Sequence, residues 1–170
     1  TTFVGSITIV PSEKVTFAPT SSKISFRVKT SNISGKPSIV TGELAINEAD
    51  ISLEQVEYIN THGTSTPIGD IAEIKAIQDL FGKHAYDLSL TSSKSMTGHL
   101  LGGSGAVEAI ISILSMQNGM VTPTINHEEG DEDPNIDYKL NFTFNQAQPR
   151  DIHYAMSNNF GFGGHNACLL

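Results

Sequence analysis

Three glycine-rich loops each carry a histidine, and they are the strongest candidates for chemistry in this sequence. The loops span residues 61–67 (THGTSTP), 94–103 (KSMTGHLLGG) and 159–166 (NFGFGGHN). They stand at the ends of predicted strands, where layered α/β folds usually bind ligands. Glycine there lets the backbone approach a ligand closely and adopt positive φ. A lone loop histidine is more often incidental, but the repeated arrangement favours a shared site.

His62 and His99 follow successive predicted strands, and each precedes a predicted helix. A neutral imidazole can donate its N–H toward a carbonyl oxygen that becomes an enolate. Near neutral pH it can also move protons in either direction. Two such donors on one oxygen would make an oxyanion site. Thr64 and Thr66 would add hydroxyls at its mouth, although both also suit ordinary turn hydroxyls that bond to the local backbone.

Asp70 and Glu73 have two interpretations. Asp70-x-x-Glu73 at the start of a helix resembles a capping box, with Asp70 as N-cap and Glu73 reaching back to its amide. Alternatively, Glu73 pairs with Lys94 near both histidines and shifts their titration. The sequence leaves both open. It supports a metal site only weakly, because no histidine lies four residues from another ligand on a predicted helix.

Strands and helices alternate from residue 51 onward, which predicts a layered α/β domain over residues 51–170. The predicted strands are 56–60, 88–92, 152–157 and 166–170. A helix is predicted at 70–81 from apolar residues three or four apart. A second helix, at 106–116, is apolar almost all round, so we expect it to be buried on several sides.

The first 50 residues have a different hydrophobic pattern, and we assign residues 1–50 to a separate β-rich segment. Alternation such as Ile24, Phe26 and Val28 against polar neighbours predicts three or four short antiparallel strands within residues 1–49. This stretch contains no histidine or cysteine. We therefore expect the chemistry to lie in the second segment.

Composition excludes several classes of function. The chain has 170 residues, 38% hydrophobic, and a net charge of −8, which argues against nucleic-acid and anionic-membrane binding. Residues 128–133 hold much of that charge, and a solvated loop is a better interpretation than an acidic docking patch. Neither a membrane span nor a signal peptide is visible, so a soluble cytoplasmic protein is expected, and the absent initiator Met suggests trimming. The single cysteine, Cys168, excludes an internal disulfide.

Four long motifs make the interpretation specific: VEYINTHGTSTPIGDIAE, LSLTSSKSMTGHLLGGSGAVEAI, TPTIN and YAMSNNFGFGGHNA. Their order and spacing resemble the second half of the elongating β-ketoacyl-[acyl-carrier-protein] synthases of fatty-acid synthesis, over roughly residues 52 to 170. The resemblance implies a thiolase-like fold of two similar halves stacked in five layers. It also implies a homodimer and a decarboxylative Claisen condensation of malonyl-acyl carrier protein with an acyl thioester. The substrate is carried on the phosphopantetheine arm of the acyl carrier protein, with no covalently bound cofactor.

The same resemblance assigns roles to individual residues. It makes His62 and His99 the histidines that assist decarboxylation and stabilise the enolate, and Lys94 with Glu73 their supporting ion pair. Thr64 and Thr66 would hold the phosphopantetheine arm. Phe160 would be the gating phenylalanine in a substrate-binding loop that includes Gly161 and Phe162. His165 is interpreted as structural.

The departures from the family are equally informative. The half that carries the nucleophilic cysteine does not occur in these residues, and Cys168 lies in the last predicted strand as a small buried hydrophobe. We expect the missing nucleophile to come from a Cys-bearing half, and the isolated chain to oligomerise or dissolve poorly. The alternative is a non-catalytic acyl- or lipid-binding or carrier-protein-docking module. Residues 1–49 show a short similarity to YceI-like lipid-binding barrels, and a hydrolase is disfavoured because no G-x-S-x-G motif is present.

Overall fold

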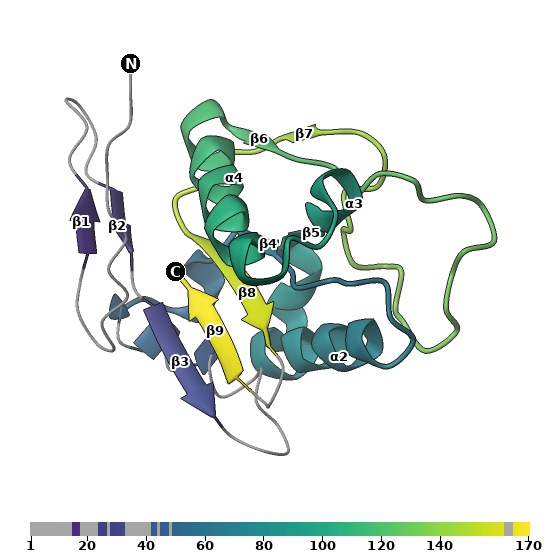
Figure 1. Cartoon of the computed structure of the whole chain (residues 1–170), viewed down its shortest axis with the longest axis horizontal. Coiled ribbons are helices and arrows are strands. Elements are labelled where there is room, and N and C mark those ends of the chain that lie inside the picture. The colour runs from purple at the N-terminus through teal and green to yellow at the C-terminus, as the bar shows by residue number, and fades with distance from the viewer. Residues whose placement is uncertain are drawn as a thin grey trace.

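A mixed five-stranded sheet forms the centre of the molecule (Figure 1). The computed structural model describes residues 15–17, 24–26, 28–32, 42–43, 45–47, 49–161 and 165–170. The strand order is β3-β9-β8-β4-β5. The strands are β3 (Val28–Asn32), β9 (His165–Leu169), β8 (Ala155–Phe160), β4 (Tyr58–Asn60) and β5 (Ser89–Thr91).

Parallel pairing brings three strand ends together. Strand β4 runs parallel to both β5 and β8, with Asn60 paired to Thr91 on one side and to Ser157 on the other. Strand β9 is antiparallel to β8 and to β3. The carboxyl ends of β4, β5 and β8 therefore lie at one edge of the sheet, and the chain leaves that edge through the three histidine-bearing loops.

Helix α2 (Gly69–Phe81) covers one face of the sheet and confirms the helix predicted at 70–81. Its buried Ile74, Ile77 and Phe81 belong to the main hydrophobic core. Side chains alternate between the two faces of a strand. Every second residue therefore faces this helix. Those that pack in the core are apolar, and Asn158 of β8, which bonds to Glu73 of α2, is a polar exception. The apolar ones include Ile59 of β4, Leu90 of β5, Met156 of β8 and Cys168 of β9.

Helix α4 (Ser104–Asn118) packs on β8 and lies on the other side of the sheet (Figure 1). Asn60 reaches it through a hydrogen bond from Nδ2 to the Glu108 carbonyl oxygen at 3.5 Å. The expectation that this helix is buried on several sides was wrong, because its buried residues lie along one side. Its buried residues are Ser104, Glu108, Ser112 and Ser115. The apolar Ile110 and Leu114 point outward and are 52% and 50% exposed, because small hydroxyl side chains let the helix lie close to a polar sheet face.

Short elements complete this part of the chain. They are η1 (Leu53–Gln55), η2 (Gly82–Asp87), α3 (Lys94–Thr97), η3 (Leu101–Gly103), β6 (Met120–Val121) and β7 (Gln148–Pro149). Strands β6 and β7 pair in antiparallel fashion. The strand predicted at 152–157 begins three residues later, because Ile152 is buried beside Tyr58 and Val121 without belonging to a strand.

The N-terminal segment contributes both to a separate ribbon and to the main sheet. Strands β1 (Val15–Phe17) and β2 (Ile24–Phe26) form an antiparallel pair, as expected for this segment. Strand β3 instead pairs with β9, so the two segments divided at residue 50 share one sheet. The residues described between 42 and 49 are mostly helical, which the sequence analysis missed. There Ala45 and Ile46 are buried in the main core.

The described elements agree with the α/β class predicted from the sequence. Parallel and antiparallel strands occur in the same sheet, with α2 packed into its apolar face and α4 on the polar one. Within the described residues, no helix combines the length and the apolar character that a membrane crossing requires.

Candidate active site

The three loops meet at the carboxyl edge of the sheet. His62 follows β4, His99 follows β5 and α3, and Phe160 ends β8. The His62 ring lies 5.4 Å from the His99 ring, centroid to centroid, in a nearly perpendicular arrangement of 86°. It lies 5.4 Å from the Phe160 ring at an interplanar angle of 60°. The structure therefore brings together the two histidines and the phenylalanine that the sequence singled out.

The turn after β4 requires glycine at position 63. Gly63 has a φ of +33°, which side-chain-bearing residues rarely adopt. A Cβ there would approach the Ser92 Cβ and the Thr61 Oγ1 to 2.7 Å. The Gly63 carbonyl also accepts a hydrogen bond of 2.6 Å from the Ser92 hydroxyl. This close contact between the loops after β4 and β5 fixes the distance between the two histidines.

Glu73 binds the backbone of the turn at His62, a role that neither interpretation of the sequence predicted. Its carboxylate accepts hydrogen bonds from the backbone N–H groups of His62 and Gly63, both at 2.9 Å. The Asn158 side-chain amide donates a third, at 3.2 Å. Burial raises the pKa of Glu73, and the hydrogen bonds from Gly63 and His62 oppose that rise.

The capping-box interpretation was wrong. Helix α2 begins at Gly69 with Ile68 at its N-cap, so Asp70 lies inside the first turn. Asp70 accepts a hydrogen bond of 3.4 Å from the Thr66 backbone N–H. Glu73 is turned toward the β4 loop rather than toward the Asp70 amide. Burial raises the pKa of Asp70, against hydrogen bonds from the 64–66 backbone.

Lys94 pairs with Glu108 of α4, not with Glu73. Both side chains are almost fully buried, with 4% and 1% exposed. The predicted Lys94–Glu73 pair was wrong because Glu73 belongs to α2 and is already occupied by the His62 turn, whereas Lys94 faces α4. Sequence reasoning missed Glu108, although it is the only charged residue of α4, a pattern that often marks a paired buried charge.

The backbone fixes the tautomer of His99. The Leu101 N–H donates a hydrogen bond of 3.1 Å to the Nδ1 atom of His99. A backbone N–H can only donate, so Nδ1 acts as an acceptor and the neutral ring carries its proton on Nε2. His99 is exposed, and its ring is thus a solvent-accessible N–H donor at the carboxyl edge of the sheet.

His62 is held neutral by its surroundings. Burial lowers its pKa to about 4, and the positive charge of Lys94 and the neighbouring His99 act in the same direction. Its Nδ1 atom is buried and finds no hydrogen-bond partner among the described residues. A neutral, partly buried imidazole is suited to exchange a hydrogen bond with a polar group of a substrate.

A cavity of about 720 Å³ opens beside His99. His99 and Lys94 line it near the sheet, and Thr64 and Thr66 line it from the loop after β4. The two threonine hydroxyls lie 3.2 Å apart, within hydrogen-bonding distance of each other. The arrangement places neutral hydroxyls in the same cavity as His99.

The far end of this cavity is aromatic and acidic. His127 stacks on Phe144 with ring centroids 3.8 Å apart, and Tyr138 and Phe142 extend the group. Asp131 and Asp133 of the acidic run border the cavity, while residues 128–132 are exposed to solvent. This exposure agrees with the prediction of a solvated acidic loop.

Cys168 is remote from reactive chemistry, as predicted. It lies in β9 with 1% exposed and packs in the main core. Burial raises the pKa of its thiol to about 12, which disfavours the thiolate that a nucleophile needs.

Two residues of the loop between β8 and β9 were predicted to bind substrate. Gly161 is described and donates its N–H to the His165 carbonyl oxygen at 2.6 Å. Phe162, expected to bind substrate, lies outside the described residues. Within the residues that are described, no three His, Cys, Asp or Glu side chains gather as a metal ion would require.

Comparisons with known proteins agree with this geometry. The family described as "Beta-ketoacyl synthase, C-terminal domain" matches residues 26–128. The 3-oxoacyl-[acyl-carrier-protein] synthase 2 of Staphylococcus aureus (strain COL) is 51% identical over 128 residues, which are 75% of this chain and 30% of that protein. The enzyme of the same name from Coxiella burnetii is 48% identical over 126 residues, 74% of this chain and 30% of that protein. The chain thus spans about 30% of the length of these relatives.

Solved structures show the same fold. The crystal structure of a β-ketoacyl synthase from Burkholderia phymatum STM815 matches with a TM-score of 0.71 and 36% identity, over 85% of this chain and 35% of that one. The AntDE:AntF complex, a type II PKS acyl-carrier protein with its ketosynthase, matches with a TM-score of 0.76 and 30% identity, over 84% and 36%. Together with the family match, these likenesses show that the chain belongs to the β-ketoacyl synthases, of which it carries C-terminal domain sequence.

Proposed function

We propose that this chain supplies the histidine half of a 3-oxoacyl-[acyl-carrier-protein] synthase, an acyltransferase of fatty-acid elongation. The observation that carries the proposal is the contact between His62 and His99, with ring centroids 5.4 Å apart beside a cavity. One ring presents an Nε2–H donor and the other is neutral at physiological pH. This pair suits a reaction in which negative charge develops on one carbonyl oxygen.

In the proposed reaction the malonyl thioester loses CO2. The electrons of the breaking C–C bond move onto the thioester, and its oxygen becomes an enolate oxygen. Hydrogen bonds from His62 and His99 would stabilise that charge, an effect that is largest when the donors are already oriented. The carbanion carbon then attacks an acyl thioester, a new C–C bond forms, and the thiolate leaves.

The threonine pair is proposed to bind the phosphopantetheine arm of an acyl carrier protein. The hydroxyls of Thr64 and Thr66 line the same cavity as His99, and an arm with amide groups would find donors and acceptors there. The AntDE:AntF neighbour is described as an acyl-carrier protein with its ketosynthase, which supports a partner of this kind. Phe160, in contact with His62, is proposed to gate the acyl group, with Gly161 and Phe162 in the same loop.

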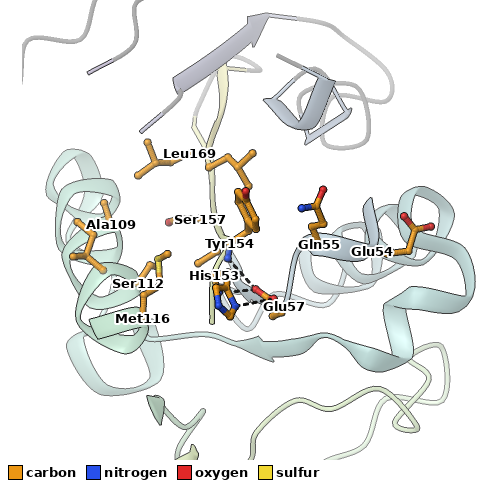
Figure 2. Close-up of a pocket in the computed structure, with 13 residues that line it drawn as sticks. Glu54, Gln55, Glu57, Ala109, Ser112, Met116, His153, Tyr154, Ser157 and Leu169 are labelled. Atoms are coloured by element: carbon orange, nitrogen blue, oxygen red, sulfur yellow. Dashed lines mark hydrogen bonds and ion pairs between the residues drawn. The ribbon is translucent and has the colours of Figure 1, made fainter. Parts of the chain in front are cut away.

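The acyl thioester itself is proposed to sit on a cysteine of a second thiolase-like half, because Cys168 is buried and poorly ionised. The outward face of α4 is the proposed contact. Ile110 and Leu114 are half exposed there, and a second cavity of about 680 Å³ opens between α4 and the last two strands (Figure 2). Ala109, Met116 and Leu169 line it, opposite the Glu57–His153 pair (Figure 2). A partner that covers this surface would bury apolar groups now in contact with water.

The test is CO2 release from malonyl-acyl carrier protein, measured for the chain alone and after addition of a Cys-bearing half from one of the relatives. We expect release in at least the second case, and a loss on the order of 100-fold for His62→Ala and for His99→Ala. Lys75→Ala is the matched control, because that side chain is exposed on α2 and lines neither of the two cavities. No release in the presence of the Cys-bearing half, or release that both site variants retain, would contradict the proposal and favour a non-catalytic binding module.

A further inference from the structure

We propose that Ser104 is a positioning residue that holds His99 in its Nε2–H tautomer through a second hydrogen bond to Nδ1. The catalytic value of this contact rests on the proposed function, but the contact itself can be tested without catalysis. The Ser104 Oγ lies 3.0 Å from the Nδ1 atom of His99. Ser104 is 2% exposed, so this contact is shielded from competing water.

The direction of the bond follows from counting protons. The Leu100 backbone N–H donates to the Ser104 Oγ at 2.8 Å, so this oxygen already serves as an acceptor. A serine hydroxyl has one proton, and the remaining neighbour at hydrogen-bonding distance is the His99 ring. Nδ1 accepts from the Leu101 N–H, so it has no proton to offer Ser104. The serine hydroxyl therefore donates to Nδ1.

The local backbone is shaped around this contact. Ser104 is the first residue of α4 and follows the short η3 turn, where the Gly103 N–H bonds to the Leu100 carbonyl at 3.0 Å. Leu101 has a φ of +51°, in the left-handed region that residues with a side chain rarely adopt. Its N–H nevertheless points to His99, so an unfavourable backbone conformation coincides with the ring contact.

The two histidines of the pair differ in this respect. His99 receives two donors at Nδ1, whereas the buried Nδ1 of His62 has no hydrogen-bond partner among the described residues. Ser104 thus acts on one ring and leaves the other as an internal reference. Removal of the hydroxyl deprives Nδ1 of one donor and the Leu100 N–H of its acceptor. The Nδ1–H tautomer of His99 then becomes more accessible, and its donor no longer points into the site.

Long-range 1H–15N spectra of the full 15N-labelled chain test this directly, because they distinguish protonated from bare ring nitrogens. In the unchanged chain we expect a bare Nδ1 and a protonated Nε2 for His99. Ser104→Ala should raise the population of the Nδ1–H tautomer relative to Nε2–H by roughly three- to tenfold, the loss of one ordinary hydrogen bond. The His62 signals should not change. Ser112→Ala is the matched control, because that buried hydroxyl of the same helix bonds to the Glu108 carbonyl and not to a histidine.

A second pair of variants keeps the proposal testable if Ser104→Ala fails to fold. Ser104→Thr and Ser104→Val have the same shape and differ only in the hydroxyl, so Thr should retain the tautomer ratio and Val should lose it. An unchanged ratio in Ser104→Ala and Ser104→Val, with native amide spectra, would overturn the proposal. Because no substrate is used, the shift can occur in a chain that fails to release CO2. A tautomer shift without CO2 release would contradict the proposed function and support the role of Ser104.

Discussion

The two faces of the central sheet are built on opposite principles. The face under α2 is mainly apolar, with Ile59, Leu90 and Met156 packed against Ile74 and Ile77. The face under α4 is polar. Tyr58 and Thr91 share a hydrogen bond of 2.9 Å there, Asn60 bonds to Ser93, and the helix contributes three serines and a buried glutamate.

This difference separates stability from function. The α2 face removes apolar area from water and so supplies the main drive to fold. The α4 face holds buried charge and hydroxyls that position Lys94 and His99, while the apolar side of α4 remains turned outward. A helix that is polar inside and apolar outside is suited to lie between two layers. We infer that α4 occupies such a central position in the complete enzyme.

The largest expected effect is on the polar face. Glu108→Ala leaves the ammonium of Lys94 buried without its counter-ion, and breaking such a pair costs about 3–5 kcal/mol of unfolding free energy. Urea unfolding followed by circular dichroism measures the loss. Glu129→Ala, an exposed glutamate of the acidic run, is the control and should change little. A loss below about 1 kcal/mol in Glu108→Ala would show that water reaches Lys94.

The next effect compares one residue type on the two helices. Ile77→Ala opens a cavity in the apolar core and should destabilise the chain by about 2–5 kcal/mol. Ile110→Ala, on the exposed side of α4, should cost less than about 0.5 kcal/mol. The same urea titration serves both. Equal losses would mean that α4 is already covered in solution, by a second copy or another surface.

The pH dependence of stability should show the contribution of His62. The pKa of His62 is about 4 in the folded chain against an ordinary 6.5, so the unfolded chain binds the proton more readily. Stability should therefore fall as the pH drops from about 6.5 to 4, by an amount on the order of 1 kcal/mol once solvent screening of this half-buried ring is considered. His62→Gln should remove that part of the loss, whereas His153→Gln should not. Identical pH profiles for the His62 variant and the unchanged chain would contradict a depressed pKa.

The smallest effect on stability should accompany a large effect on association. Ile110→Asp combined with Leu114→Asp places charge on the outward face of α4 and leaves the buried residues untouched. We expect the unchanged chain to self-associate and the double variant to sediment closer to a monomer in analytical ultracentrifugation. The matched control is Lys75→Asp with Asp79→Lys on the exposed side of α2. A monodisperse monomer of the unchanged chain would exclude association through α4.

Several features could be predicted from the sequence because they depend on local pattern. The period of α2, the strand that leads to His62 and the burial of Cys168 all follow from apolar spacing. The partner of Lys94 could not be found in this way. Glu73 and Glu108 are both helical glutamates, and only the placement of their helices on opposite faces decides which one meets the lysine.

The orientation of α4 was also beyond sequence reasoning. A helix with apolar residues almost all round gives no periodic signal that says which side faces the sheet. The serines decide it, because a polar sheet face accepts them and rejects the larger isoleucines. The role of Ser104 could not be predicted from the sequence either, because its contact with His99 depends on the turn at Leu101.

The central claim is that this chain carries the histidine pair of a working condensing site, and a chimera tests it most directly. The 128-residue segment of the Staphylococcus aureus enzyme that matches this chain would be replaced by the corresponding residues of the chain. The chimera should release CO2 from malonyl-acyl carrier protein and extend an acyl thioester. His62→Ala and His99→Ala should each reduce release on the order of 100-fold, and Lys75→Ala, on the exposed side of α2, should not. A folded chimera that is inactive, or whose activity survives both substitutions, would contradict the claim.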